Sequence, residues 1–258
     1  MASAFKIITE EFIDDMDAIR SLVVTFSDPQ KTAKSRIAAA NSATLLVAAT
    51  FEEFIREMAR EFARAVVANA VSYEKLPTKL ASTAWKRTMD GLSKLRFDGV
   101  QAGATAESVF GTAQARFNVI YEFCKGDLTQ DIYRELIHNE NNMRPGELNG
   151  LFKVSGLTDV CTKLSDKGPI LEVFGETEPC KAHGKLLLSL EDFFERRNAI
   201  AHSLNPGHSS GPDQILNDLT MLESFGKALC TTLETVVPRP GSQVRADVSV
   251  PPMGTPSE

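Results

Sequence analysis

The 258-residue sequence has few aromatic residues and no pair of cysteines at a metal-binding spacing. It contains 15 Phe, 3 Tyr and 1 Trp, while Ala, Leu, Glu, Lys and Arg are abundant, which favours helices. The four cysteines form no Cys-x-x-Cys pair, so neither a zinc site nor a disulfide framework is indicated. We therefore expect reduced thiols, a cytoplasmic location and no cofactor.

Long hydrophobic runs are also absent. No stretch approaches the roughly 18 apolar residues that a membrane helix needs, and the N-terminus lacks the basic and apolar segments of a secretory signal. The hydrophobic content of 43% is nevertheless enough for a sizeable core. We expect one helical domain over residues 1–237. Residues 238–258 are rich in Pro, Gly and Ser, which predicts a disordered tail.

Basic residues are fewer than acidic residues, which gives a formal net charge of −6. Proteins that coat nucleic acids without sequence preference are usually basic, so any contact with RNA must come from a local positive site. Glycine-rich phosphate loops, Ser-His-Asp signatures and dinucleotide-binding fingerprints are missing too. Their absence removes most other enzyme classes.

Apolar residues instead recur every three or four positions, which predicts an all-α fold. The expected helices are residues 9–26, 30–71, 77–95, 105–125, 127–139, 157–165, 186–204 and 213–237. Residues 139–156 and 167–183 contain Gly and Pro and are expected to be loop-rich or irregular, with 170–174 as the sole strand candidate. The helix over 30–71 would be roughly 60 Å long. Such a length favours an overhang or a dimer interface.

The helix over residues 186–204 carries the polar residues of greatest interest. On a helical wheel, Arg197 shares a stripe with Leu186, Leu190, Phe193 and Ile200. A charged group in such a stripe needs a partner or an anionic ligand, because an isolated buried charge is costly. Along one flank lie the polar side chains of Glu191, Glu195, Asn198 and His202.

Two explanations of this pattern remain open. In the first, Arg197 pairs with an acidic residue of a neighbouring helix, and His202 interacts with the C-terminal turn, where a cation is favoured. In the second, the arginine and the histidine form a site for chemistry.

The sequence from Arg197 to His202, Arg-Asn-Ala-Ile-Ala-His, resembles the R-[polar]-x-x-x-H signature of the HEPN superfamily. Residues 45–61 are similar to the Ala-rich, acid-bearing early helix of its RiboL-PSP-type branch. Residues 141–144, leading to 151–157, are similar to the middle segment of that branch. The resemblance covers about residues 40–237 and leaves out the chain before Pro29 and the tail.

This resemblance implies a HEPN-like helical bundle that forms a homodimer, in which two Arg-x4-His motifs face one cleft. It implies metal-independent cleavage of RNA in a bacterial toxin or anti-phage defence system, with an antitoxin or defence partner. His202 would act as acid or base, Arg197 would hold the scissile phosphate, and Asn198 would orient His202 or bind the phosphate. Supporting roles are open to Glu52, Glu53 and Glu195. The alternative is a non-catalytic HEPN-like dimer that binds RNA, a nucleotide or a protein; a silent structural helper is a third possibility.

Other polar residues give weaker indications of a functional site. Glu135 and His138 have the spacing of half a di-iron site, but no second Glu-x-x-His exists. The histidines His183 and His208 lie in irregular segments, with nothing to single them out. Arg196 and Lys185 border the key helix and are expected to be exposed, where they could touch the RNA backbone.

Overall fold

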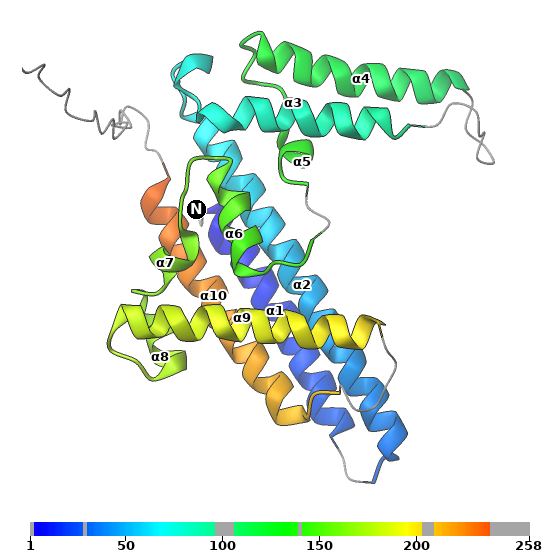
Figure 1. Cartoon of the computed structure of the whole chain (residues 1–258), viewed down its shortest axis with the longest axis vertical. Coiled ribbons are helices and arrows are strands. Elements are labelled where there is room, and N and C mark those ends of the chain that lie inside the picture. Colours follow the sequence, from blue (N-terminus) through cyan, green and yellow to red (C-terminus); the bar gives the residue numbers. More distant parts are fainter. Residues whose placement is uncertain (1–2, 28–29, 96–105, 139–140, 203–208, 238–258) are drawn as a thin grey trace, which may run out of the picture.

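The computed structural model describes residues 3–27, 30–95, 106–138, 141–202 and 209–237 (Figure 1). The described residues form α-helices, one short 3-10 turn at Tyr73–Lys75 and no strand, which confirms the predicted all-α fold. The helices are α1 (Ala4–Phe26), α2 (Ala33–Ala68), α3 (Thr78–Ser93), α4 (Ala106–Cys124), α5 (Tyr133–Leu136), α6 (Pro145–Lys153), α7 (Val160–Leu164), α8 (Gly168–Phe174), α9 (Pro179–His202) and α10 (Pro212–Val236). The predicted tail, from residue 238, lies outside the described residues.

Three long helices, α1, α2 and α10, lie side by side and form the core (Figure 1). Phe12 of α1 stacks on Phe54 of α2 with ring centroids 4.1 Å apart. Phe51 of α2 meets Phe225 of α10 edge to face at 5.3 Å. Such aromatic pairs add to the area burial that stabilises the core. A cluster of phenylalanine rings therefore joins α1, α2 and α10, although α10 is far from the other two helices in sequence.

Helix α2 is one continuous element of 36 residues. Its N-terminus is capped by Thr32, whose Oγ1 accepts a hydrogen bond from the Ser35 amide at 3.2 Å. The helix lies within the predicted range of residues 30–71 and is not interrupted. Because its buried face runs through the middle of the molecule, α2 can present residues to several neighbours at once.

Helix α9 crosses the three-helix core (Figure 1). It begins at Pro179, seven residues before the predicted start at Leu186. A proline is compatible with the first turn of a helix, since the amide it lacks would have no intrahelical acceptor there. The buried rings of Phe193 and Phe194 anchor the helix, and Phe194 lies 6.3 Å from the Phe51 ring.

The segments predicted to be irregular are more helical than expected. Residues 145–153 form α6, and the strand candidate at 170–174 lies within α8. A short apolar run such as Ile-Leu-Glu-Val-Phe fits a buried helix as well as a strand, so the sequence alone does not distinguish the two. Conversely, the predicted helix over 127–139 contracts to the four residues of α5.

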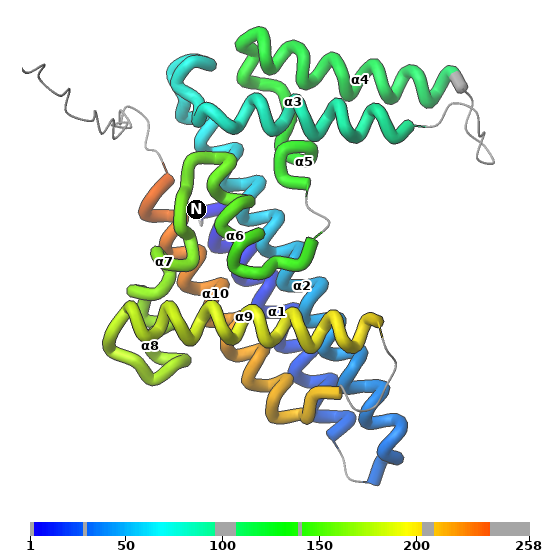
Figure 2. The backbone as a smooth tube through the Cα atoms, in the orientation of Figure 1, coloured from blue at the N-terminus to red at the C-terminus, as the bar shows by residue number. Residues whose placement is uncertain are grey.

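The α3 and α4 helices form a hairpin that lies across one end of the core (Figure 2). Short helix α5 joins this hairpin to α2. No helix within the described ranges is long and apolar enough to cross a membrane. All four cysteines are unpaired, and burial raises the pKa of the Cys161 thiol to about 12.

Candidate functional site

The last turns of α9 carry the polar residues that the sequence singled out. Ile200 is buried, whereas Arg197 and Asn198 are half-buried and His202 is exposed as the final helical residue. Arg197 thus lies at the edge of the buried face. The helical wheel had predicted that it lies within that face. Its Nε is nevertheless shielded from solvent and has no hydrogen-bond acceptor among the described residues.

A pair of amide side chains holds Arg197. Its Nη1 donates to Oδ1 of Asn198 at 3.2 Å, and the same oxygen accepts a hydrogen bond from Nδ2 of Asn142 at 2.8 Å. Asn142 lies just before α6, 56 residues away in sequence. The amide of Asn198 therefore contacts Arg197, and no hydrogen bond joins Asn198 to His202 among the residues that the structure describes.

Glu52 of α2 faces the same arginine. The residue is 8% exposed, and burial raises the pKa of its carboxyl group, while the charges of Arg197 and then Arg56 act in the opposite direction. Its Oε2 lies 3.4 Å from Arg56 Nη2, but its Oε1 is buried and no residue within the described ranges donates a hydrogen bond to it. In the described part of the chain, the site thus contains a buried acceptor, Glu52 Oε1, and a buried donor, Arg197 Nε, that each lack a hydrogen-bond partner.

The other two acidic candidates lie elsewhere. Glu53 is exposed and pairs with Arg56 at 2.9 Å and Arg60 at 2.8 Å, both on its own helix. Glu195 is exposed and forms no hydrogen bond or ion pair with the described residues. Of the three predicted supporting carboxylates, the structure therefore brings Glu52 to Arg197.

Ion pairs fix α9 on either side of this network. Arg144 Nη1 binds Glu191 Oε2 at 2.9 Å, joining the segment before α6 to α9. Arg196 Nη2 contacts both carboxylate oxygens of Asp218 on α10, at 2.7 and 2.8 Å. Arg196 was expected to be an exposed charge available to RNA; it is instead half-buried and paired, because α10 places Asp218 against it.

His202 stands apart from these contacts. Within the described part of the chain its imidazole has no hydrogen-bond partner. An imidazole is a common general acid or base in enzymes, and here it is exposed at the end of α9. The arrangement therefore combines a positioned guanidinium, which suits a phosphate, with an accessible acid–base group.

The remaining candidates have structural partners. His183 Nδ1 lies 3.1 Å from Ser165 Oγ, and Lys185 pairs with Glu176 at 2.6 Å. Glu135 pairs with Arg116 at 2.8 Å. His208 lies outside the described residues. Among the residues that the structure describes, no three His, Cys, Asp or Glu side chains gather as a metal site requires.

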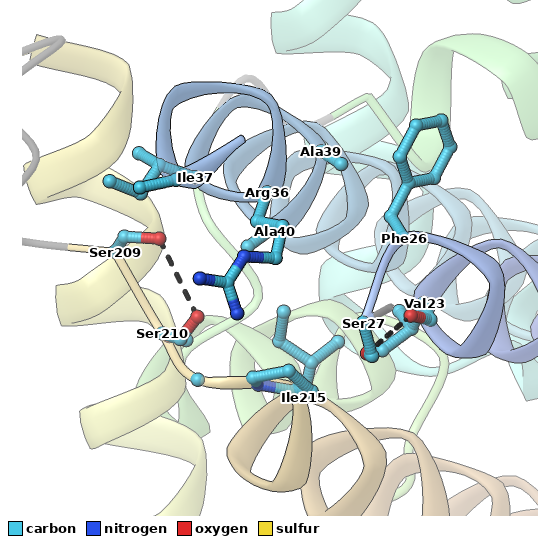
Figure 3. A pocket seen from close by; sticks show the side chains of 13 residues that line it. Val23, Phe26, Ser27, Arg36, Ile37, Ala39, Ala40, Ser209, Ser210 and Ile215 are labelled. Carbon is cyan, nitrogen blue, oxygen red and sulfur yellow. Dashed lines mark hydrogen bonds between the residues drawn. The ribbon is translucent and has the colours of Figure 1, made fainter. Parts of the chain in front are cut away.

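Two hollows elsewhere in the fold were not predicted. One, of about 340 Å³, lies where the end of α1, the start of α2 and the start of α10 meet, and Arg36 reaches across it toward Ile215 (Figure 3). The other, of about 960 Å³, lies between α3, α4 and α5. Neither of these two hollows is lined by Arg197, Asn198 or His202.

The helical bundle, with its polar cluster at the end of a core-crossing helix, defines an all-α domain with a candidate site on its surface. The sequence model of the RiboL-PSP-HEPN family matches residues 10–235. The chain therefore belongs to the RiboL-PSP-HEPN family. The match also includes most of α1, which the resemblance seen in the sequence had left out. No curated protein and no solved structure matches the chain.

Sequence reasoning missed two residues of the site, Asn142 and Arg144. Both lie in the middle segment that resembled the family, so their position was marked but their roles were not. One signal could have indicated these roles: the two polar residues lie directly before a helix and face another helix that has unpaired polar residues. The structure gathers all three resembling segments, from α2, residues 141–144 and α9, at one place.

Proposed function

We propose that this protein is a metal-independent endoribonuclease that cleaves RNA at a composite site formed by two copies of α9. The observation that carries the proposal is the Arg197 guanidinium, fixed by Asn198 and Asn142 beside Glu52, with the accessible His202 five residues further along the helix. Membership of the HEPN family supports an RNase-type or nucleotide-binding function.

The proposed reaction is an intramolecular transesterification. His202 removes the proton from a ribose 2′-hydroxyl, the 2′-oxygen attacks phosphorus, and the bond from phosphorus to the 5′-oxygen breaks. A second imidazole protonates the departing 5′-oxygen, giving a 2′,3′-cyclic phosphate and a 5′-hydroxyl. Arg197 binds the non-bridging oxygens, where negative charge grows in the transition state.

A homodimer supplies both imidazoles. One chain contributes a single His202 on an open surface, whereas a two-fold axis through this surface would bring two histidines and two arginines into one cleft. The cleft would place its positive charge locally, which reconciles RNA binding with the net charge of −6. By analogy with its family we propose a cytoplasmic toxin or anti-phage defence role, controlled by an antitoxin or defence partner.

The test is cleavage of end-labelled RNA by the purified protein in excess chelator. We expect products that end in a 2′,3′-cyclic phosphate, and a loss of at least about 100-fold in rate for His202→Ala and for Arg197→Ala. His183→Ala, at the other end of the same helix, is the matched control and should cleave normally. Cleavage that requires a divalent metal, or full activity in His202→Ala, would overturn the mechanism.

Mixed dimers test the composite cleft separately. When wild-type and His202→Ala chains are co-expressed in equal amounts, a shared cleft retains about a quarter of the activity, from wild-type pairs alone. Independent sites would retain half. The comparison requires light scattering to confirm that the two chains associate.

A non-catalytic HEPN-like dimer that binds RNA, a nucleotide or a protein is the second candidate. The acidic net charge favours it, because a nuclease with broad substrate affinity usually carries more positive charge. Saturable RNA or nucleotide binding without products, and without growth arrest on expression, would support this reading over the nuclease.

A further inference from the structure

The α3–α4 hairpin exposes a continuous run of aromatic rings. Trp85 of α3 meets Phe117 of α4 edge to face at 6.1 Å, and Phe117 stacks on Tyr121 at 5.7 Å with an angle of 21°. The ammonium group of Lys125 lies 5.3 Å from the Tyr121 centroid. The run Trp85–Phe117–Tyr121–Lys125, here called the aromatic ladder, thus crosses from one helix to the other.

The ladder is open to solvent. Trp85 and Phe117 are each 37% exposed, and Tyr121 is 42% exposed. Phe110, on the same stripe of α4, is 57% exposed. Burial of these rings against the core would stabilise the fold, so their arrangement on an outer surface requires another explanation. Their partial stacking also fixes the rings in place, so that a ligand would meet an ordered surface.

The α3 side of the ladder is positive, in contrast with the whole chain, whereas on the α4 side Lys125 Nζ lies 3.4 Å from Glu122 Oε2. Between residues 78 and 95 there are four basic side chains and one acidic side chain, whereas the whole chain has a net charge of −6. Lys79, Lys86 and Lys94 are exposed, and no described carboxylate pairs with them. Exposed lysines beside exposed rings are the combination with which proteins bind single-stranded nucleic acids.

The same charges disfavour the other occupants of such a surface. Protein interfaces are depleted in lysine at their centres, where desolvation of an ammonium group is costly. A two-fold contact between copies would place each basic patch on its own equivalent, and like charges would repel. A single-stranded polyanion supplies both the bases for the rings and the phosphates for the lysines.

We propose that the aromatic ladder of the α3–α4 hairpin binds single-stranded RNA, with bases stacked on the exposed rings and phosphates paired with Lys79 and Lys86. The identity of the nucleic acid rests on the proposed function, whereas the stacking surface does not. The ladder is a binding surface distinct from Arg197 and His202, since α9 crosses the core away from the hairpin (Figure 1). It would select unpaired RNA, because bases within a duplex cannot stack on protein rings.

The test uses the full chain with His202→Ala and a 2′-O-methyl oligoribonucleotide, which lacks the attacking hydroxyl. Trp85 is the one tryptophan of the sequence, so its fluorescence reports on the ladder directly. We expect saturable quenching by the single strand and at least tenfold weaker binding of the matching blunt duplex. The double variant Phe117→Leu, Tyr121→Leu should raise the Kd for the single strand at least tenfold.

Two matched controls accompany these variants. Leu188→Ala removes an exposed apolar side chain from α9 and should leave the Kd unchanged. Lys86→Glu should weaken binding and reduce its salt dependence, whereas Lys227→Glu on the exposed side of α10 should do neither. Thermal unfolding establishes that each variant is folded.

The outcomes separate the two proposals. Quenching that depends on Phe117 and Tyr121, in a protein that cleaves no RNA, would support the ladder and overturn the nuclease. Cleavage with an unchanged Kd in the double variant would overturn the ladder and leave the nuclease standing. A double variant that instead lowers the mass of the oligomer would assign the surface to contact between copies, against the proposal.

Discussion

Asn142 Nδ2 donates a hydrogen bond of 2.8 Å to Oδ1 of Asn198, the same atom that accepts a bond from Arg197 Nη1. An amide before α6 thereby determines how an arginine on α9 is held. The relationship links a residue that has no role in chemistry to one that is proposed to bind phosphate.

Asn142→Ala should therefore lower RNA cleavage by about 10- to 100-fold, because a displaced guanidinium no longer meets the transition-state oxygens. The loss should fall mainly on kcat, with thermal stability little changed. Asn217→Ala, an exposed amide on α10, is the control. An equal loss in both variants would show that Asn142 does not act through the site.

Glu52→Gln should change how stability depends on pH. Since burial raises the pKa of Glu52, the folded protein holds that proton more tightly than the unfolded chain, whose pKa is near 4.5. Stability from this group is therefore present below pH 4.5 and is lost as pH rises through the folded pKa. In urea unfolding at several pH values, the variant should lose less stability than wild type over this window. Parallel curves would contradict the assignment.

Arg196→Ala should destabilise the fold by about 3 kcal/mol, because it leaves the buried Asp218 carboxylate without its positive partner and with Gln214 Nε2 as its remaining donor. Burial raises the pKa of Asp218, and the hydrogen bond and charge of Arg196 oppose that shift. The double variant Arg196→Met, Asp218→Leu should recover much of the loss in urea unfolding. If the double variant is as unstable as Arg196→Ala, the cost does not come from the uncompensated charge.

Gly226→Ala should be destabilising by about 1–3 kcal/mol, even though alanine favours helices. A Cβ at this position would lie 2.9 Å from Cε1 of Phe12 and 3.4 Å from Cζ of Phe54, inside the aromatic core. Gly184→Ala on α9 meets no atom within 4 Å and should be neutral or stabilising by up to about 1 kcal/mol. Thermal unfolding of both variants makes the comparison.

The sequence predicted the long helices well, because each presents a periodic apolar face. Helix α2 and the α9 motif were both located from that period, and the all-α fold follows from it. The shorter elements were less predictable: α8 was read as a possible strand, since seven residues carry too little periodicity to decide.

The site was predictable in its segments and not in its contacts. The positions of Arg197 and His202 came from the motif, but the pairing of Arg196 with Asp218 depends on the crossing of α9 and α10. No local pattern encodes that crossing. For the same reason Glu52 and Glu53 were equivalent in sequence, although one helical step of about 100° turns Glu53 away from Arg197.

The contacts around Arg197 have a consequence for synthesis of the protein. Glu52 and Asn142 leave the ribosome before α9, but Asp218, which fixes the neighbouring Arg196, leaves later. The contacts of Arg197 can therefore form before α10 has been translated, whereas the ion pair between Arg196 and Asp218 forms only afterwards.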